Sequence, residues 1–422
     1  MSTSELTPAP SRPALEDRTR RNTFRYLWSA SFISTLGDGV LLAALPLMAA
    51  ALTKDPRLVA GVAFAGRLPW LVLALFGGVI VDRFDRRRLM IGTQIGQLSL
   101  VTLIAMVATL DLSEIWMIYI FAFGIGCGDI LFTGASQAIV PTLVRPDELE
   151  RANGRLIGAE SVSREFLGPP LGAALFAFAT PFPFWVDAVT FLLSIVLLAR
   201  IRTPAPATEP IDTIEPAAVP ARRGMFAEIA EGLRWLGRAR LPRALTLIAA
   251  AGNFAEAMAL SLLVLFAHEV LGLGDFGFGL LLAAMAAGGV LGSLVSGWVV
   301  ARFGAREVAI AVQVISPAAW LAIGFYGRNV VVVVALFTVF SIALAMWNVV
   351  SVSVRQRLIP NELLGRVTSA GRMLAYGATP LGALAGGFVA DTYGLVSPWI
   401  VGGVISLLVA AVSLPVLRRW DS

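Results

Sequence analysis

The chain has 422 residues, of which 57% are hydrophobic and 14% are charged. A water-soluble chain of this length needs far more charge on its surface, so the composition excludes a soluble protein. Apolar runs of about 20 or more residues dominate, as bilayer-crossing helices require, whereas the short alternating strands of a closed β-barrel are absent from the pattern. We therefore predict an all-α polytopic membrane protein.

Most enzyme chemistries are also excluded. Cys127 is the only cysteine and His268 the only histidine, so neither a disulfide framework, a metal cluster nor a histidine-based catalytic triad can be assembled. A phosphate-binding Gly-x-x-x-x-Gly-Lys motif is absent, and the only lysine, Lys54, falls in an expected loop. We expect no enzyme, no metal and no cofactor, and ATP cannot be a direct energy source.

The expected elements begin with a tail at 1–23, which is rich in proline and arginine and should be solvated in the cytoplasm. Twelve membrane-spanning helices follow in two six-helix, pseudo-symmetric bundles at 24–201 and 243–417, and the chain ends in a short tail at 418–422. The first bundle is expected at 24–51, 58–82, 89–110, 114–140, 152–179 and 183–201. The second is expected at 243–268, 276–301, 307–327, 330–355, 363–390 and 396–417.

Arginines fall almost entirely on one side of this topology, and the other side has little beyond Lys54, Arg57 and Arg328. Cytoplasmic loops of membrane proteins carry such an excess, so both termini should lie in the cytoplasm of a multi-pass protein of the cell inner membrane. The isoelectric point near 9.9 then reflects topology and not nucleic-acid binding.

The segment 202–242 separates the two bundles. Its first part, 203–220, is rich in proline and predicts an extended linker. In its second part Phe226, Ile229, Leu233 and Leu236 recur at helical spacing between charged residues. They predict an amphipathic helix, which either lies on the inner membrane surface or binds a partner.

Several landmarks recur between the two bundles. The turn that starts at Gly78 is repeated at Gly297, and the pair Gly37-Asp38 is repeated as Gly252-Asn253. The Pro-Leu-Gly sequence at 170–172 is repeated at 380–382. Duplicated helical bundles of this kind are typical of transporters that rock two halves about a central site.

Ionisable residues inside the apolar spans are the candidate site, because each costs about 2.5–3.5 kcal/mol at a helix centre and seldom faces lipid. Asp38 and Glu256 should lie near mid-depth on the symmetry-related first and seventh helices and face each other, with Arg67 neutralising Asp38. The expected proton and substrate cavity comprises Asp38, Arg67, Asp129, Glu160, Arg164, Glu165, Asn253 and Glu256.

The spacing of Glu160 and Arg164 predicts a pair within one helix turn, which leaves Asp129 and Glu165 without evident partners. Asp187 should be a solvated acid near the outer end of its helix. His268 and Glu269 should form a solvated pair at the outer mouth.

The basic turns suggest a conformational latch. Asp82 carries a charge that the arginine bias does not explain, and the second copy has Ala301 in its place, so the latch should be asymmetric. The alternative is that the arginines serve only membrane topology. The proposed latch comprises Gly78, Asp82, Arg83, Arg86, Arg87, Arg302 and Arg306.

The turn at 78–88 resembles the loop signature of the major facilitator superfamily, and the topology resembles that superfamily from about 22 to 417. Asp85 replaces a glycine of the general signature, and the fourth helix lacks an arginine that many drug exporters carry. Gly168, Pro169, Pro170 and Gly172 should break the fifth helix and resemble part of the antiporter motif, although a simple kink explains them equally. The sequences at 66–69 (Gly-Arg-Leu-Pro), 152–154 (Ala-Asn-Gly) and 168–172, together with the turn at 82–87, are similar to those of the macrolide-efflux and enterobactin-exporter branch of this superfamily.

That resemblance implies export of an amphiphilic, drug-like or macrolide-like molecule by proton antiport, by a monomer in the lipid bilayer and without nucleic acid. A siderophore or lysophospholipid transporter is the alternative, and a non-transporting receptor or scaffold is a remote one. Five buried acids face two arginines in the expected cavity, a formal charge of −3, which favours a cationic or neutral substrate over an anionic one.

Overall fold

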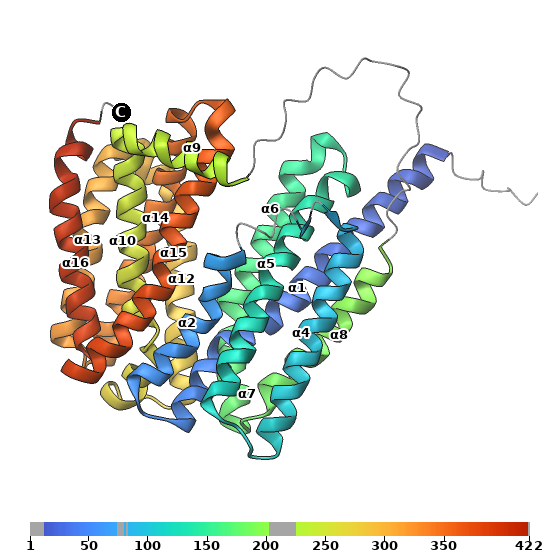
Figure 1. Ribbon diagram of the computed structural model, residues 1–422, viewed down its shortest axis with the longest axis horizontal. Coiled ribbons are helices and arrows are strands. Elements are labelled where there is room, and N and C mark those ends of the chain that lie inside the picture. Colours follow the sequence, from blue (N-terminus) through green and yellow to red (C-terminus); the bar gives the residue numbers. More distant parts are fainter. Residues whose placement is uncertain (1–11, 74–79, 82, 202–224, 421–422) are drawn as a thin grey trace, which may run out of the picture.

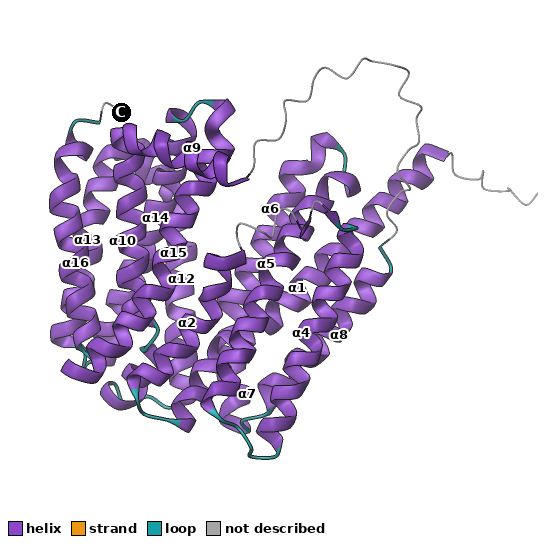
Figure 2. Cartoon of the chain, viewed as in Figure 1, coloured by secondary structure: helices purple, strands orange, loops and turns teal. Residues whose placement is uncertain are grey.

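The computed structural model describes residues 12–73, 80–81, 83–201 and 225–420, and within them the regular elements are helices (Figures 1 and 2). The first half contains α1 (Arg12–Leu52), α2 (Pro56–Leu73), α4 (Arg86–Thr109), α5 (Ile115–Leu143), η1 (Pro146–Glu148), α6 (Leu149–Glu160), η2 (Ser161–Leu167), α7 (Gly168–Phe178) and α8 (Phe182–Ala199). The second half contains α10 (Arg240–Leu260), α11 (Leu263–Leu265), η3 (Phe266–Val270), α12 (Asp275–Phe303), α13 (Ala305–Tyr326), α14 (Val330–Leu358), α15 (Asn361–Tyr393) and α16 (Ser397–Arg418). Between them lies α9 (Met225–Arg238).

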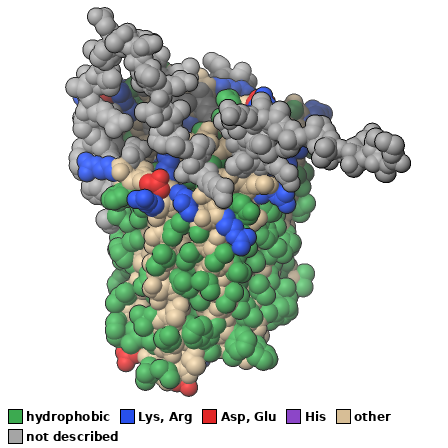
Figure 3. Space-filling view, turned by 90° about the vertical axis from the view of Figure 1, so that its right-hand side faces the viewer, with side chains coloured by type: hydrophobic (Ala, Val, Ile, Leu, Met, Phe, Trp, Pro, Cys, Tyr) green, Lys and Arg blue, Asp and Glu red, His purple; other side chains and the backbone are tan. Residues whose placement is uncertain are grey.

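Within the described ranges, nine helices are long and apolar enough to cross a membrane, and a tenth span is formed by α10 with its continuation, which bends by 44° after Leu260. The two remaining expected spans coincide with α2 and with the run α6–η2–α7, which a π-helical segment interrupts. Figure 3 shows the resulting belt of hydrophobic side chains, bounded at one end by arginines. The chain is a polytopic helical membrane protein, as predicted.

The first helix starts earlier than expected. It begins at Arg12, although its membrane-spanning part begins at Asn22, so the 1–23 tail is helical over its last residues. The other expected spans agree with the observed helices to within a few residues, apart from the bend after Leu260 and from the span at 58–82, of which α2 covers the part up to Leu73 and whose end lies largely outside the described residues.

Helix ends follow from local chemistry. The Asp85 carboxylate accepts the Arg88 backbone N–H at 2.8 Å and caps α4, which explains an acid in this otherwise basic turn. Gly304 and Gly394 have φ values of 92° and 88°, which a side chain disfavours, and they end α12 and α15.

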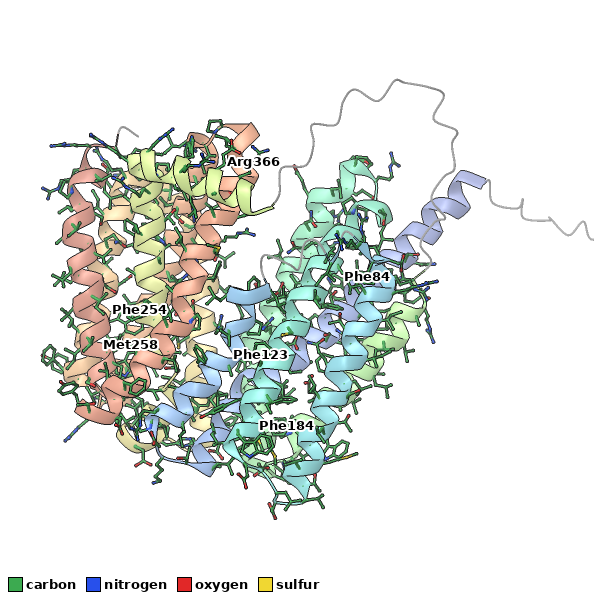
Figure 4. The ribbon with its side chains drawn as sticks, in the orientation of Figure 1. Phe84, Phe123, Phe184, Phe254, Met258 and Arg366 are labelled. Atoms are coloured by element: carbon green, nitrogen blue, oxygen red, sulfur yellow. The ribbon has the colours of Figure 1, made fainter. Side chains whose placement is uncertain are left out.

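The two halves repeat one packing feature. A Cβ atom placed on Gly172 would lie 2.2 Å from the Val40 carbonyl oxygen, and one on Gly382 would lie 2.2 Å from the Phe254 carbonyl oxygen. Each glycine therefore lets the fifth helix of its half touch the backbone of the first, α7 against α1 and α15 against α10. This equivalence supports the internal repeat inferred from the sequence. Figure 4 shows Phe254 on α10 inside the second half.

The amphipathic helix α9 packs on its own chain. Leu233 and Leu236 join a small apolar cluster with Val367 and Ala370 of α15, and Glu231 pairs with Arg366 at 3.0 Å. Figure 4 shows Arg366 beside this helix. The sequence did not predict this contact with α15, and the two expected roles, a helix on the inner membrane surface and a helix that binds a partner, stay predictions.

The two halves meet at one end of the molecule and diverge toward the other (Figure 1). We call the end with α9 and the arginines Arg86–Arg88 the basic end, and the end with Lys54 and Asp391 the opposite end. The contact between the halves, which we call the seam, is made mainly by α2 against α15 and by α7 against α12.

Candidate functional site

Three adjoining cavities lie along the centre of the molecule. The N-terminal cavity has a volume of about 350 Å³, the central cavity about 480 Å³ and the C-terminal cavity about 610 Å³. The first two share Asp38, Asp129 and Arg164, and the last two share Asn253, Glu256 and Tyr376. The volumes suit a drug-sized molecule, and the shared residues join both halves into one polar tract. Seven of the eight expected cavity residues line this tract.

Asp129 is held firmly. Its Oδ2 accepts Arg164 Nη2 at 2.9 Å, and its Oδ1 accepts Gln97 Nε2 at 3.1 Å. The expectation that Arg164 pairs with Glu160 and that Asp129 lacks a partner was therefore wrong. The cause is the π-helical segment η2, which contains Arg164 and changes the rotation of the helix at that point.

Asp38 is the contrasting acid. Its side chain lines both the N-terminal and central cavities, the residue is 9% exposed, and its Oδ1 has no hydrogen-bond partner among the described residues. An ionised carboxylate without donors is costly in such surroundings. The groups that could satisfy it are a proton or a cationic part of a bound molecule.

Arg67 and Glu256 come from different halves and line the same central cavity. Their opposite charges attract one another, but among the described residues Arg67 forms no ion pair with either Glu256 or Asp38, so the expected neutralisation of Asp38 by Arg67 stays a prediction. The rings of Trp70 and Tyr376, which also line this cavity, pack against each other at a tilt of 34°, with centroids 6.1 Å apart.

Three other acids, Glu160, Glu165 and Asp187, were considered from the sequence. Glu160 lines the N-terminal cavity, whereas Glu165 is exposed and lines none of the three cavities. Asp187 was expected near the surface but is fully buried, with 0% exposure. Its Oδ1 accepts the Thr190 hydroxyl at 2.9 Å and faces Gly37, which has no side chain to occupy that space.

Three of the expected latch residues, Arg87, Arg302 and Arg306, contact their own halves. Gly78 and Asp82 lie outside the described residues. Arg87 donates to the carbonyl oxygens of Leu198 and Ala199, at 3.2 and 2.6 Å, and so caps the end of α8. Arg83 is exposed and Arg86 half-buried.

In the second copy of the turn, Arg306 pairs with Glu307 at 2.7 Å, and Arg302 lies over the Phe303 ring at 5.5 Å. The described interactions of Arg87, Arg302 and Arg306 thus stay within one half, where a latch across the basic end was expected. In this structure the halves are apart at that end (Figure 1).

The fifth helix was expected to break at 168–172, but its irregular part is the π-helical segment that precedes these residues. The π-helical segment spans Ser161–Leu167, and Gly168 starts a regular helix whose first turn contains Pro169 and Pro170. A Cβ atom on Gly168 would lie 2.5 Å from the Gly39 backbone. The motif therefore brings the fifth helix against α1 one residue after Asp38.

The opposite end is closed by ion pairs between the halves. Lys54 pairs with Glu269 at 2.8 Å, and Arg57 approaches Asp391 at 3.5 Å while also binding Asp55. Glu269 thus points across the seam and not to His268, whose ring nitrogen lies 3.3 Å from Asp275. The expected solvated pair was wrong.

Sequence reasoning missed several cavity residues. Gln97 and Tyr376 are neutral and gave no signal, Arg372 was overlooked, and Arg355 was assigned to membrane topology. Both arginines line the C-terminal cavity, so the count of five acids against two arginines was incomplete. No group of His, Cys, Asp and Glu in the described part of the chain is arranged to hold a metal ion.

Two six-helix halves around a central polar tract define a transporter of the major facilitator type, not an enzyme. A family model described as transmembrane secretion effector matches residues 18–422, and the chain belongs to that family. Multidrug efflux pump Tap of Mycolicibacterium fortuitum is 27% identical over 423 residues, covering 96% of this chain and 98% of that protein. Macrolide efflux protein A of Streptococcus pyogenes is 21% identical over 403 residues, covering 92% and 94%.

Solved structures support the fold. A bacterial homologue of the iron transporter ferroportin, in an inward-facing state, matches with a TM-score of 0.73 at 17% identity, covering 94% of this chain and 99% of that one. The nucleoside transporter NupG matches with a TM-score of 0.76 at 10% identity, covering 93% and 99%. At these identities the likeness concerns the fold alone.

Proposed function

We propose that this transporter is a secondary exporter, which moves an amphiphilic small molecule out of the cell in exchange for protons. Both termini lie in the cytoplasm in this proposal, so that the basic end faces inward and the structure is open to the cell interior. The arginine bias of the sequence supports that orientation. The efflux functions that the names of its relatives record support the direction of transport.

The observation that carries the proposal is the state of Asp38. This acid is buried, unpaired at Oδ1 and placed where the N-terminal and central cavities meet. A proton and a cationic substrate group compete for such a carboxylate. Because only one can occupy it at a time, the competition couples proton entry to substrate release.

The test is gradient-driven uptake of a labelled macrolide into inverted membrane vesicles that contain the full-length protein. Asp38→Asn keeps the volume of the side chain but cannot gain and lose a proton, so uptake should fall to background while the protein is still inserted. Asp111→Asn, in the exposed turn after α4, is the matched control and should transport normally. Asp111 has a positive φ of 55°, which asparagine also tolerates.

Wild-type rates in Asp38→Asn would remove this residue from the coupling. Macrolide uptake that ignores an imposed pH gradient would exclude proton antiport altogether. A siderophore or lysophospholipid carrier would show gradient-driven uptake of those compounds and none of the macrolide. A receptor or scaffold would show no flux of any of these compounds.

A further inference from the structure

The C-terminal cavity contains two arginines that have no ion pair with an acid among the residues whose side chains the structure describes. Arg355 of α14 and Arg372 of α15 both line it, and their positive charges repel one another. Among the described residues neither arginine has a carboxylate within ion-pair distance. Glu256 is the acid that lines the same cavity, and its charge interacts with Arg67 of the other half.

The conformation of Arg355 points away from a role in membrane topology alone. An arginine near a helix end usually extends toward the aqueous side. Arg355 instead turns back along α14, where its Nε donates to the Ser351 carbonyl at 3.0 Å and its Nη2 to the Ser351 hydroxyl at 3.1 Å. The guanidinium is thereby held half-buried beside the cavity. Arg357, two residues further on, is exposed and lines none of the three cavities.

The rest of the cavity is suited to an apolar group. Trp320, Phe340 and Trp347 line it, and the rings of Trp320 and Phe340 pack edge to face at 4.9 Å between centroids. A cavity of about 610 Å³ with a cationic part and an aromatic part matches a molecule that has an anionic group and an apolar body.

We infer that Arg355 and Arg372 form an anion-binding subsite, which takes the phosphate, sulfonate or carboxylate group of an amphiphile whose apolar part lies on Trp320, Phe340 and Trp347. Guanidinium groups are well suited to this role because their fixed fork of N–H donors matches such oxyanions. The role of the subsite in transport rests on the proposed export function, whereas its existence does not. The subsite also revises the expected preference for cationic or neutral substrates, which came from a count without these two arginines.

The probe is hexyl phosphate, with hexanol and inorganic phosphate as partial ligands. Binding is measured by isothermal titration calorimetry on the full-length protein in phosphatidylcholine nanodiscs. Hexyl phosphate should bind at least about tenfold more tightly than either partial ligand, as a charge-assisted hydrogen bond gives. Arg355→Gln and Arg372→Gln should each weaken it about tenfold, and the matched control Arg357→Gln should leave it unchanged.

Two lysine variants test whether weaker binding reflects the loss of the guanidinium group or the loss of folding. Arg355→Lys and Arg372→Lys keep the charge but lose the fork, so they should bind with intermediate affinity at an unchanged melting temperature. Unchanged binding in all four variants would overturn the subsite, and so would an equal loss in Arg357→Gln, which would indicate general surface charge. Inorganic phosphate binding as tightly as hexyl phosphate would overturn the apolar part.

A second series with phosphatidylglycerol in the nanodiscs separates the two sources of such an anion. Competition by this lipid would identify the ligand as a lipid headgroup, and its absence would identify a soluble amphiphile. The titration uses no pH gradient and no transport. Failure of vesicle uptake with intact hexyl phosphate binding would therefore remove the proposed function and leave the subsite standing, and the reverse result would remove the subsite alone.

Discussion

Asp38 and Asp129 line the same two cavities but are held in opposite ways. Asp129 accepts hydrogen bonds from Arg164 and Gln97, which compensate its charge within the protein. Asp38 has an oxygen that no described group satisfies. One acid is therefore compensated within the protein, and the other is the acid to which the proposed function assigns the proton.

The Asp129–Arg164 pair should contribute to stability. Asp129→Asn leaves Arg164 without its charged partner and should cost about 1–3 kcal/mol of folding stability. The melting temperature of the purified protein measures this loss. Adding Arg164→Gln should recover part of it, because the uncompensated cation is then removed. A double variant that is less stable than the sum of the two single changes would contradict the pairing.

Asp55 should give a small, pH-dependent contribution. Hydrogen bonds from the Arg57 side chain hold the pKa of Asp55 below its usual value. A lowered pKa means that the contribution is present above the ordinary range of an aspartate and is lost as the pH falls through the lowered value.

The melting-temperature difference between wild type and Asp55→Asn should therefore be constant from about pH 5 to 8, should begin to decrease at about pH 4, and should disappear only below the lowered pKa of Asp55. Thermal unfolding at a series of pH values measures it. Taking the difference cancels the titration of other groups. A difference that grows as the pH falls would show that Arg57 does not stabilise the ionised form.

For single residues, the sequence predicts which residues line the cavity better than it predicts which groups they bind. Asp38, Asp129 and Glu256 stand out because charges are rare in apolar spans. The pairing of Asp129 with Arg164 depends on the rotation of two helices about their axes, which the π-helical segment changes. No periodicity in a single sequence contains that rotation, and for the same reason the buried position of Asp187 against Gly37 was not predicted.

The element with the most testable role is α9. Its Gly232 lies against α15, and a Cβ atom there would be 2.5 Å from the Arg366 carbonyl oxygen. The helix therefore docks through a position without a side chain, next to the Glu231–Arg366 ion pair.

Gly232→Ala should force α9 away from α15. The overpacking should cost about 1–3 kcal/mol, measured as a lower melting temperature together with faster proteolysis next to α9. Gly237→Ala is the matched control, because nothing lies within 4 Å of a Cβ atom at that position of the same helix. Equal effects of the two substitutions would show that docking is not the cause.

Element boundaries were largely predictable, because runs of apolar residues between proline, glycine and charged residues define helices well. The departures have local causes. The π-helical segment and the bend after Leu260 depend on packing against neighbours, and the helical start at Arg12 continues a good helix-forming sequence beyond the membrane.

For the whole molecule the seam is the part that must change during transport. A Cβ atom on Gly387 of α15 would lie 3.0 Å from the Ala60 Cβ of α2, and Lys54 and Glu269 pair nearby. These contacts close the opposite end while the basic end is open, as alternating access requires of one of its two states.

Cysteines at Ala60 and Gly387 should form a disulfide in a Cys127→Ser background. The two Cβ positions lie 3.0 Å apart, nearer than the about 3.5–4.5 Å of natural disulfides, and a Cβ atom on Gly387 also lies 2.9 Å from the Arg57 Cα, so α2 and α15 must separate slightly to accept the cross-link. Oxidation should stop vesicle uptake nearly completely, and a reductant should restore it. Each single cysteine variant is the control. Uptake that continues after complete cross-linking would show that the seam does not open.

The two-half architecture was predictable because the repeat places landmarks in the same order twice. The conformational state was not, since the sequence is common to every state of the cycle. The arginine pair of the C-terminal cavity was missed for a related reason: Arg355 lies near the basic end, where an arginine is expected in any case.

The paired glycine contacts of Gly172 and Gly382 have a mechanical meaning. Through Gly172, the seam helix α7 packs against α1, which contains Asp38. Through Gly382, the seam helix α15 packs against α10, which contains Glu256. Because the backbones of the two helices are in direct contact, the helices of a pair cannot easily shift relative to each other. In the proposed proton-coupled cycle, motion at the seam displaces the acid directly, and a proton gained at the acid acts on the seam without an intermediate relay of side chains.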